Sequence, residues 1–190
     1  MNPSLKKQIL SIASFSEKEI ETIDSCFEYE KFNAKEYLSL MGKISNKIFF
    51  IIEGLARAYY LKDGKEITTY LSCDDGFIAS YSSFINQSVS FENIQCIEDC
   101  KVLSITFEKM QFLYNEIPNW ERVGRILAEQ NYICMADRVL KLQMIPAKEK
   151  YQTFLASAPA KIIQRTPLIY IASFLGITPE SLSRIRQDIS

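Results

Sequence analysis

The sequence has 190 residues, of which 47% are hydrophobic and 24% are charged, and this balance is typical of one large or two small globular domains. It contains no histidine, which excludes His-based catalytic triads, histidine-ligated haem and most zinc sites. No window is apolar enough for a membrane span, and residues 1–10 lack the basic-then-apolar order of a secretory signal. We therefore expect a cytoplasmic protein with no membrane partner, no metal and no cofactor.

The cysteines are dispersed and include no C-x-x-C pair, which argues against a disulfide framework or an iron-sulfur cluster. We expect reduced, buried thiols at all five positions and no redox activity from the neighbouring pair Cys96 and Cys100. The net charge is −1, but residues 1–145 carry a net charge of −4 and residues 146–190 one of +3. The basic C-terminal part hints at an anionic partner.

The first half of the chain predicts helices followed by strands. Helices are expected over Leu5–Phe15 and Ser16–Phe27, with Ser16 as the N-cap of the second. Short segments rich in β-branched and aromatic residues then indicate strands over Tyr29–Phe32, Lys47–Glu53, Leu55–Leu61, Glu66–Leu71, Glu92–Ile97 and Lys101–Phe107. The dipeptide Asp63-Gly64 predicts a tight hairpin. These elements predict an antiparallel sandwich or small barrel over residues 28–108.

A long helix is expected from Trp120 to about Ile145, where Pro146 would end it. It carries two rows of mainly apolar residues. The first row is Val123, Ile126, Gln130, Ile133, Asp137 and Leu140, with Met144 beyond it, and the second is Ala128, Tyr132, Met135, Val139 and Leu142. One row would pack on the β-domain and the first row on the same helix of a second chain, which makes a homodimer. The alternative is that both rows are core within a monomer.

Residues 147–190 predict three short helices, Ala147–Ala156, Pro167–Leu175 and Thr178–Ile189. Gly176 suits the left-handed end of one helix, and Thr178 with Pro179 suits the start of the next, so the last two form a helix-turn-helix. The polar side of the last helix fits a DNA major groove, because Arg can bond guanine and Glu can accept from cytosine. The expected DNA contacts are Thr178, Pro179, Glu180, Ser181, Arg184, Arg186 and Gln187. The alternative is an ordinary helical hairpin with a solvated polar face.

A β-domain, a long helix and a helix-turn-helix in this order resemble the Crp/Fnr family of bacterial transcription regulators, over essentially the whole chain. The segment Tyr170–Arg186 looks like the recognition motif of members from Bacteroidetes-type bacteria. Phe50–Gly54, which reads FIIEG, is similar to the signature of the family's cyclic-nucleotide-type domain, and Asp75–Ile78 is similar to the entry of its phosphate-binding cassette. In the family, the residues matching Glu180 and Arg184 touch bases.

The resemblance implies an α+β fold with three parts. These are an antiparallel β-roll or jelly-roll sensor domain over residues 1–117, a long dimerisation helix over 118–145 and a helix-turn-helix domain over 146–190. It implies double-stranded DNA as a partner, with RNA polymerase and a small-molecule effector as candidate partners. Members commonly add a β-wing after the recognition helix, whereas this sequence ends at Ser190, so we expect fewer phosphate contacts and a flatter salt dependence.

The family's cyclic-nucleotide pocket looks degenerate in this chain. The Gly-Glu pair of the cassette reads Ala79-Ser80, the position of the phosphate-binding Arg falls near Ser90 or Phe91, and the hydroxyl pair of the long helix aligns with two apolar residues. A buried phosphate without a cation costs several kcal/mol. We therefore expect no response to cyclic AMP, and a pocket with a more apolar ligand or with none. The expected pocket residues are Phe77, Ile78, Ala79, Ser80, Ser90, Phe91, Met135 and Ala136.

The predicted function is a homodimeric, sequence-specific DNA-binding transcription regulator that reads a palindrome with its last helix. The alternative is a ligand-binding or protein-interaction module of the cyclic-nucleotide fold whose helical tail does not bind DNA. We do not expect an enzyme, because carboxylates such as Glu53, Asp74 and Asp75 show no spacing that implies acid-base chemistry.

Overall fold

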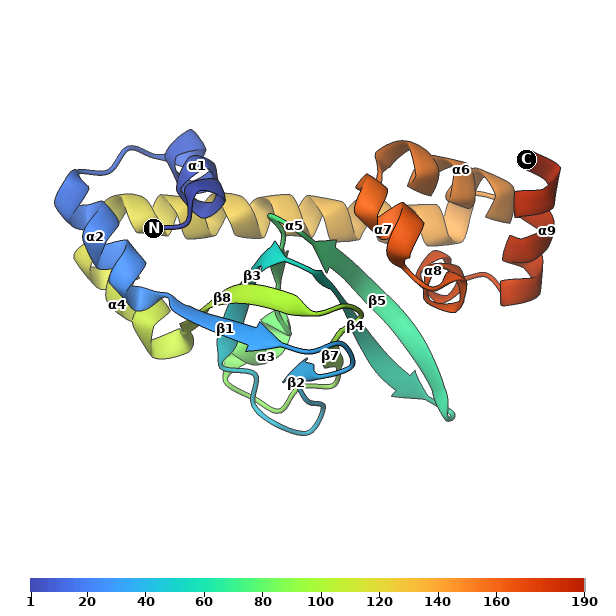
Figure 1. Ribbon diagram of the computed structural model, residues 1–190, viewed down its shortest axis with the longest axis horizontal. Coiled ribbons are helices and arrows are strands. Elements are labelled where there is room, and N and C mark those ends of the chain that lie inside the picture. Colours follow the sequence, from blue (N-terminus) through green and yellow to red (C-terminus); the bar gives the residue numbers. More distant parts are fainter. Residues whose placement is uncertain (190) are drawn as a thin grey trace.

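The structure is a computed structural model that describes residues 1–189, so Ser190, at which the given sequence ends, lies outside the described residues. The long helix α5 (Pro118–Met144) runs along the length of the molecule (Figure 1). The β-domain lies against its middle, helices that precede it in the chain lie around its first turns, and the C-terminal helices gather at its other end. None of the helices within residues 1–189 is long and apolar enough to cross a membrane.

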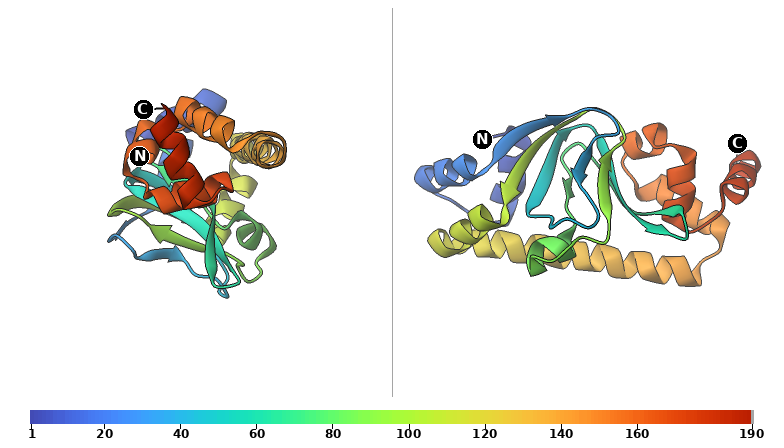
Figure 2. Two further views of the ribbon diagram at one scale, coloured as in Figure 1. Left: turned by 90° about the vertical axis from the view of Figure 1, so that its right-hand side faces the viewer. Right: turned by 90° about the horizontal axis from the view of Figure 1, so that it is seen from below.

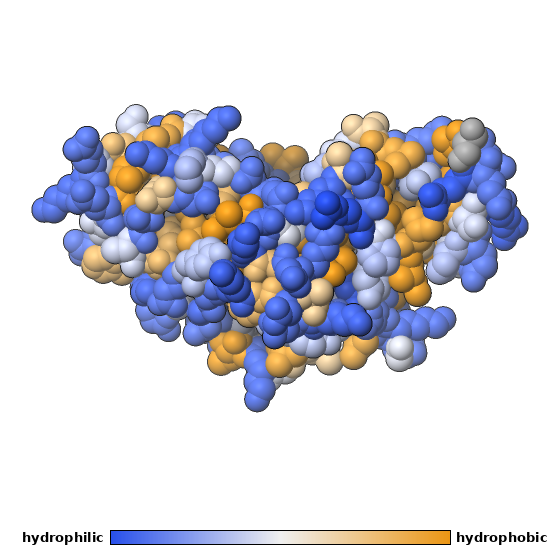
Figure 3. All heavy atoms as spheres, in the orientation of Figure 1, coloured by the Kyte–Doolittle hydropathy of each residue, from blue (hydrophilic) through white to orange (hydrophobic). Residues whose placement is uncertain are grey.

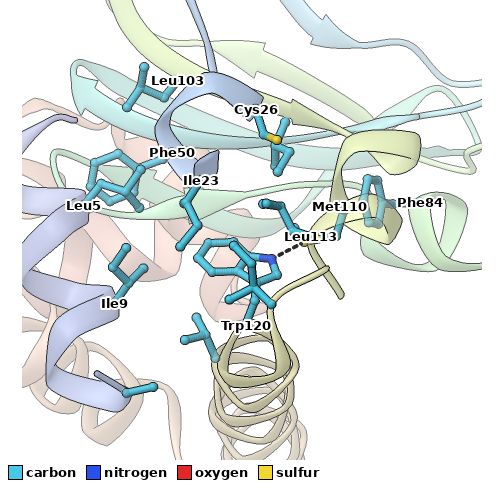
Figure 4. Packing of buried hydrophobic residues seen from close by; sticks show 14 residues of the cluster. Leu5, Ile9, Ile23, Cys26, Phe50, Phe84, Leu103, Met110, Leu113 and Trp120 are labelled. Atoms are coloured by element: carbon cyan, nitrogen blue, oxygen red, sulfur yellow. Dashed lines mark hydrogen bonds between the residues drawn. The ribbon is translucent and has the colours of Figure 1, made fainter. Parts of the chain in front are cut away.

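The first turns of α5 lie in an apolar core with the N-terminal helices and one face of a β-sheet. The helices that contribute are α1 (Pro3–Ile12), α2 (Glu17–Cys26) and α4 (Phe107–Glu116). As predicted, Ser16 caps α2, since its Oγ accepts from the N–H of Glu19 and the Glu19 carboxylate accepts from the Ser16 N–H. Trp120 lies at the centre of this cluster, and its indole N–H points at the sulfur of Met110, 3.2 Å away (Figure 4).

The β-domain is two antiparallel four-stranded sheets, ordered β1-β8-β3-β6 and β2-β7-β4-β5. The strands are β1 (Glu28–Phe32), β2 (Tyr37–Ser39), β3 (Lys47–Glu53), β4 (Leu55–Lys62), β5 (Lys65–Cys73), β6 (Phe77–Ile78), β7 (Asn93–Cys96) and β8 (Cys100–Thr106). Between the sheets lies a core that includes Phe49, Ile51, Ile94 and Val102. The jelly-roll architecture and the α+β fold class predicted from the sequence are therefore confirmed.

The turn between β4 and β5 has the conformation that its dipeptide predicts. Asp63 and Gly64 have φ angles of +53° and +75°, the left-handed values of a two-residue hairpin turn. β5 lies at the edge of its sheet, so the outer side of this strand offers unpaired backbone groups to whatever packs beside it.

The C-terminal part contains four helices, one more than the sequence predicted. They are α6 (Ala147–Ser157), α7 (Ala160–Arg165), α8 (Leu168–Leu175) and α9 (Pro179–Ile189). The sequence also did not predict β2, β6, α4 or the short helix α3 (Tyr81–Asn86). The four C-terminal helices share one apolar core with Leu55, Leu71 and Cys73 of the β-domain.

All five cysteines are free thiols. Four of them are buried, but Cys134 on α5 is exposed, so the expectation that every thiol is buried is wrong at that position. Cys134 lies on a helix whose sides meet both the β-domain and solvent, which a count of cysteines cannot reveal.

Candidate nucleic-acid interface and ligand cavity

The connection between α8 and α9 has the geometry of a helix-turn-helix. Gly176 ends α8 with φ +65°, and the N–H of Ile177 bonds back to the carbonyl of Ala172 at 3.0 Å. The hydroxyl of Thr178 then accepts from the N–H of Ser181 at 3.1 Å, which caps the first turn of α9. Ala172 is fully buried, which lets the two helices approach closely.

α9 buries one side and presents the other. Leu182 and Ile185 are buried in the C-terminal core, whereas six of the predicted contact residues are exposed: Thr178, Pro179, Glu180, Arg184, Arg186 and Gln187. Ser181 is half-buried. Hydrogen bonds from its own backbone N–H and from Thr178 lower the pKa of Glu180, so this side chain is an acceptor at neutral pH. α9 lies at the end of the molecule that is farthest from the N-terminal helices (Figure 1).

α8 docks on the edge strand β5. The hydroxyl of Ser173 accepts from the N–H of Thr68 at 2.9 Å and donates to the carbonyl of Glu66 at 3.1 Å, so one side chain pairs two backbone groups of the open edge. From α5, the guanidinium of Arg138 donates to the carbonyls of Thr68 and Phe174 at 3.3 and 3.0 Å. The position of the helix-turn-helix is thus defined by hydrogen bonds to both the β-domain and the long helix.

A buried arginine completes this contact. Arg57 on β4 has a side chain only 1% exposed, and its guanidinium stacks on the rings of Tyr59 and of Tyr170 from α8. It also bonds to Glu66 and to the amide oxygen of Gln95, the latter at 3.0 Å. The only arginine of the β-domain therefore serves the contact with the helix-turn-helix.

Ion pairs between α7 and the β-domain add to this contact. Lys161 on α7 lies 2.7 Å from the carboxylate of Asp74, which also accepts from the N–H of Gly54, and Arg165 lies 3.3 Å from Glu98. Two of the carboxylates that the sequence set apart from acid-base catalysis thus have structural partners, because Asp74 binds Lys161 and Glu53 pairs with Lys101.

The outer side of α5 lies at the rim of the molecule in both views of Figure 2, and several of its side chains are exposed. Its exposed apolar side chains are Tyr132, Ile133, Val139, Leu140 and Met144. They come from both predicted rows, because Met135 and Leu142 of the second row turn inward while Tyr132 and Val139 turn out.

Not every residue of the predicted dimer row lies on this face. Val123 is 1% exposed and belongs to the N-terminal core, so its place in a dimer contact is wrong. Ile126 is half-buried, and Gln130 and Asp137 are exposed, with Asp137 paired to Lys141 one turn on. A period of three and four residues does not tell which partner covers each turn of a helix this long.

A cavity of about 640 Å³ lies between β5, β6, α3 and the middle of α5. Of the predicted pocket residues, Phe77, Ile78, Ala79 and Met135 line it. The other four do not, and their assignment to the pocket is corrected. Ser80 and Ser90 are buried and bond to each other at 2.9 Å, Phe91 is 80% exposed, and Ala136 lies one residue beyond the lining. Ser90 and Phe91 lie between α3 and β7, where the sequence left the alignment with the family's cassette open to a gap.

The cavity lining is mainly apolar and aromatic. Among the described residues that line it there is no lysine or arginine, and one ionisable carboxylic acid, Glu92. Glu92 accepts from the hydroxyl of Thr69 at 3.1 Å. Neither residue was singled out from the sequence, and no motif marks them, because only the fold brings β5 next to the segment before β7. A cyclic phosphate does not fit these residues, since no cation faces it.

Comparison with known proteins identifies the β-domain and the overall fold. Residues 29–116 match the family model of the cyclic nucleotide-binding domain. FixK2 from Bradyrhizobium japonicum is similar in structure with a TM-score of 0.75 and 17% identity, over 86% of this chain and 84% of that one. A protein from Eubacterium rectale assigned to the Crp/Fnr transcriptional regulators has a TM-score of 0.68 and 17% identity, over 92% and 83%. The chain has the Crp/Fnr fold.

The resemblance seen in the sequence is thereby confirmed at the level of fold, while the likeness to Bacteroidetes-type members stays a prediction. CLP from Xanthomonas campestris, described as a regulator responsive to c-di-GMP, is also similar in structure, with a TM-score of 0.71 and 13% identity over 92% of this chain and 91% of that one. No curated protein matches the sequence significantly.

Proposed function

We propose that this protein is a homodimeric, sequence-specific DNA-binding transcription regulator that reads a palindromic site with α9 and does not respond to cyclic AMP. The observation that carries the proposal is the exposed polar side of α9 behind a capped helix-turn-helix, with Glu180 and Arg184 one turn apart. Arg bonds guanine with two donors and Glu accepts from cytosine, so this pair suits base recognition.

The apolar outer side of α5 supports the homodimer. Ile126, Ile133 and Leu140 are spaced by seven residues, the repeat of a two-stranded coiled coil, and Tyr132 and Val139 lie beside them. A parallel pair of α5 helices brings both copies of α9 to the same end of the dimer. Two recognition helices about 34 Å apart then meet successive turns of one face of a duplex.

The missing cation supports the absence of a cyclic AMP response. The arginine of the β-domain is stacked against Tyr170 of α8, and the described cavity lining contains no lysine or arginine. An anion that left water for this cavity would lose its hydration without compensation.

Domains are proposed at residues 1–117 for the sensor, 118–145 for the long helix and 146–190 for DNA binding. The core shared by the C-terminal helices and the β-domain makes these units interdependent in this arrangement. RNA polymerase remains a candidate partner.

Fluorescence anisotropy with the upstream DNA of the gene and a scrambled duplex, over a salt series, tests the proposal. We expect Arg184→Ala to weaken specific binding by about 1–3 kcal/mol. Arg122→Ala is the matched control, because it removes the same exposed charge from the far end of α5. If the wild-type protein binds neither duplex at low salt, the protein-interaction alternative replaces DNA binding.

A further inference from the structure

The cavity between the β-domain and α5 is large enough for a small molecule, since ligand sites commonly measure about 300–1,000 Å³. Its walls come from elements far apart in the sequence. Tyr70 and Phe77 line it from the strands, Phe84 from α3, and Leu127 and Met135 from α5. Apolar and aromatic side chains thus enclose it from three directions, and they favour a ligand with a mainly apolar body.

The lining includes one carboxylic acid, Glu92. Glu92 is half-buried, and it forms no salt bridge with any described residue. Its hydrogen bonds come from hydroxyl groups, that of Thr69 at 3.1 Å among them. A carboxyl group held away from water without a cation is costly, so a donor that reaches it from the cavity would gain a strong, charge-assisted hydrogen bond.

The same group disfavours anions. A carboxylate or phosphate in the cavity would face Glu92 with no lysine or arginine in the described lining to offset the repulsion. An alcohol would donate one hydrogen bond to the carboxylate, whereas an ammonium group has three N–H donors and the opposite charge. The apolar walls and the single acid therefore favour the same class of ligand, which is a mainly apolar molecule with a positively charged head.

We infer that this cavity binds a mainly apolar small molecule with an amine head, and that the amine bonds to Glu92. The role of such a molecule as an effector rests on the proposed function, but its binding does not.

Trp120 supplies a direct measure of occupancy. It is the only tryptophan of the chain and it lines the cavity while only 4% exposed to solvent. Its emission therefore reports on a molecule that enters, without a label and without DNA.

The experiment titrates the full-length protein with octylamine, octanol and octanoate, which share one chain and differ in the head, and with cyclic AMP as a second anion. We expect a saturable change of Trp120 emission with octylamine at a concentration at least tenfold lower than with octanoate. Isothermal calorimetry of the same solutions confirms a defined stoichiometry.

Glu92→Gln keeps the shape of the side chain and removes the charge, and it should bring octylamine to the affinity of octanol. Glu21→Gln on α2 is the matched control, because Glu21 is exposed and lies outside the cavity lining, and it should change nothing. Ala128→Phe, which fills the cavity from α5, should weaken the binding of octylamine, octanol and octanoate alike. Thermal melting of this variant shows whether the protein is still folded.

Octanoate binding as tightly as octylamine, an unchanged amine preference in Glu92→Gln, or no emission change with any of the chains would each overturn the inference. A protein that binds octylamine but no DNA would retain the inference and lose the proposed function. One that binds DNA but none of the chains would do the reverse.

Discussion

The guanidinium of Arg57 lies 3.6 Å from the centre of the Tyr170 ring, and this contact joins strand β4 to the first helix of the helix-turn-helix. Around it, apolar side chains of α8 also reach the surface, with Ile169 59% exposed, and the strip that they form is visible over α8 in Figure 3. The contact with the β-domain therefore uses only one side of α8.

Replacing Tyr170 with leucine should lower the free energy of unfolding by about 1–2 kcal/mol, because a stacked, desolvated cation loses one of its two rings. Urea denaturation measures this difference. Tyr29→Leu is the matched control, since Tyr29 is exposed and the Lys31 ammonium lies 5.9 Å from its ring, and it should cost less than half as much. An equal cost in both variants would show that the stack does not stabilise the contact.

Ile133→Glu should convert a dimer into a monomer at micromolar concentration, because the substitution places a charge in the proposed helix pair. Sedimentation velocity measures the mass. Phe112→Glu on α4 makes the same kind of change at an exposed apolar residue away from α5, and it should leave the mass unaltered. A wild-type protein that sediments as a monomer would contradict the proposed dimer.

Gly176→Ala should destabilise the protein by about 1–2 kcal/mol, because a residue with a Cβ resists the left-handed conformation at φ +65°. The added Cβ would also lie 3.0 Å from a methyl group of Leu142 on α5. Gly176→Asn should lose less stability than Gly176→Ala, since asparagine tolerates the left-handed conformation better. Thermal melting of the two variants separates them, and a smaller loss in alanine than in asparagine would refute this account.

Burial raises the pKa of Glu92, against the lowering effect of hydrogen bonds from Thr69 and Ser80. A raised pKa means that the group contributes stability below its unfolded pKa of about 4.3 and that this contribution is lost as the pH rises through the folded value. Without ligand, Glu92→Gln should therefore melt at a higher temperature than the wild type at neutral pH, and the gap should close toward pH 4. Glu21→Gln should show no such trend, and a constant gap for Glu92→Gln would contradict the raised pKa.

The sequence predicted those parts of the structure that local signals specify. The Asp63-Gly64 turn, the cap at Ser16 and the left-handed Gly176 each require particular residues at particular places, and each was found where predicted. The order of β-domain, long helix and helix-turn-helix followed from such signals.

What the sequence missed depends on contacts between distant segments. Val123 fits a dimer row by its spacing, but the N-terminal helices cover it. Glu92 and Thr69 meet because β5 and β7 both pair with β4 in one sheet, and neither carries a local mark of a cavity. In the sequence, Ser173 looks like an ordinary polar residue of a helix. Its role in pairing backbone groups of β5 is evident only once the fold places the open edge of that strand beside α8.

α5 is one uninterrupted helix of 27 residues. In its middle turns, one side faces the cavity and the other side is exposed. Asn131 and Met135 line the cavity, while Tyr132 and Ile133 lie on the outer side. Because successive residues of a helix are fixed about 100° apart, a rotation of α5 that widened the cavity would turn Ile133 by the same angle. The width of the cavity and the direction of the outer apolar side chains are therefore geometrically coupled within one chain.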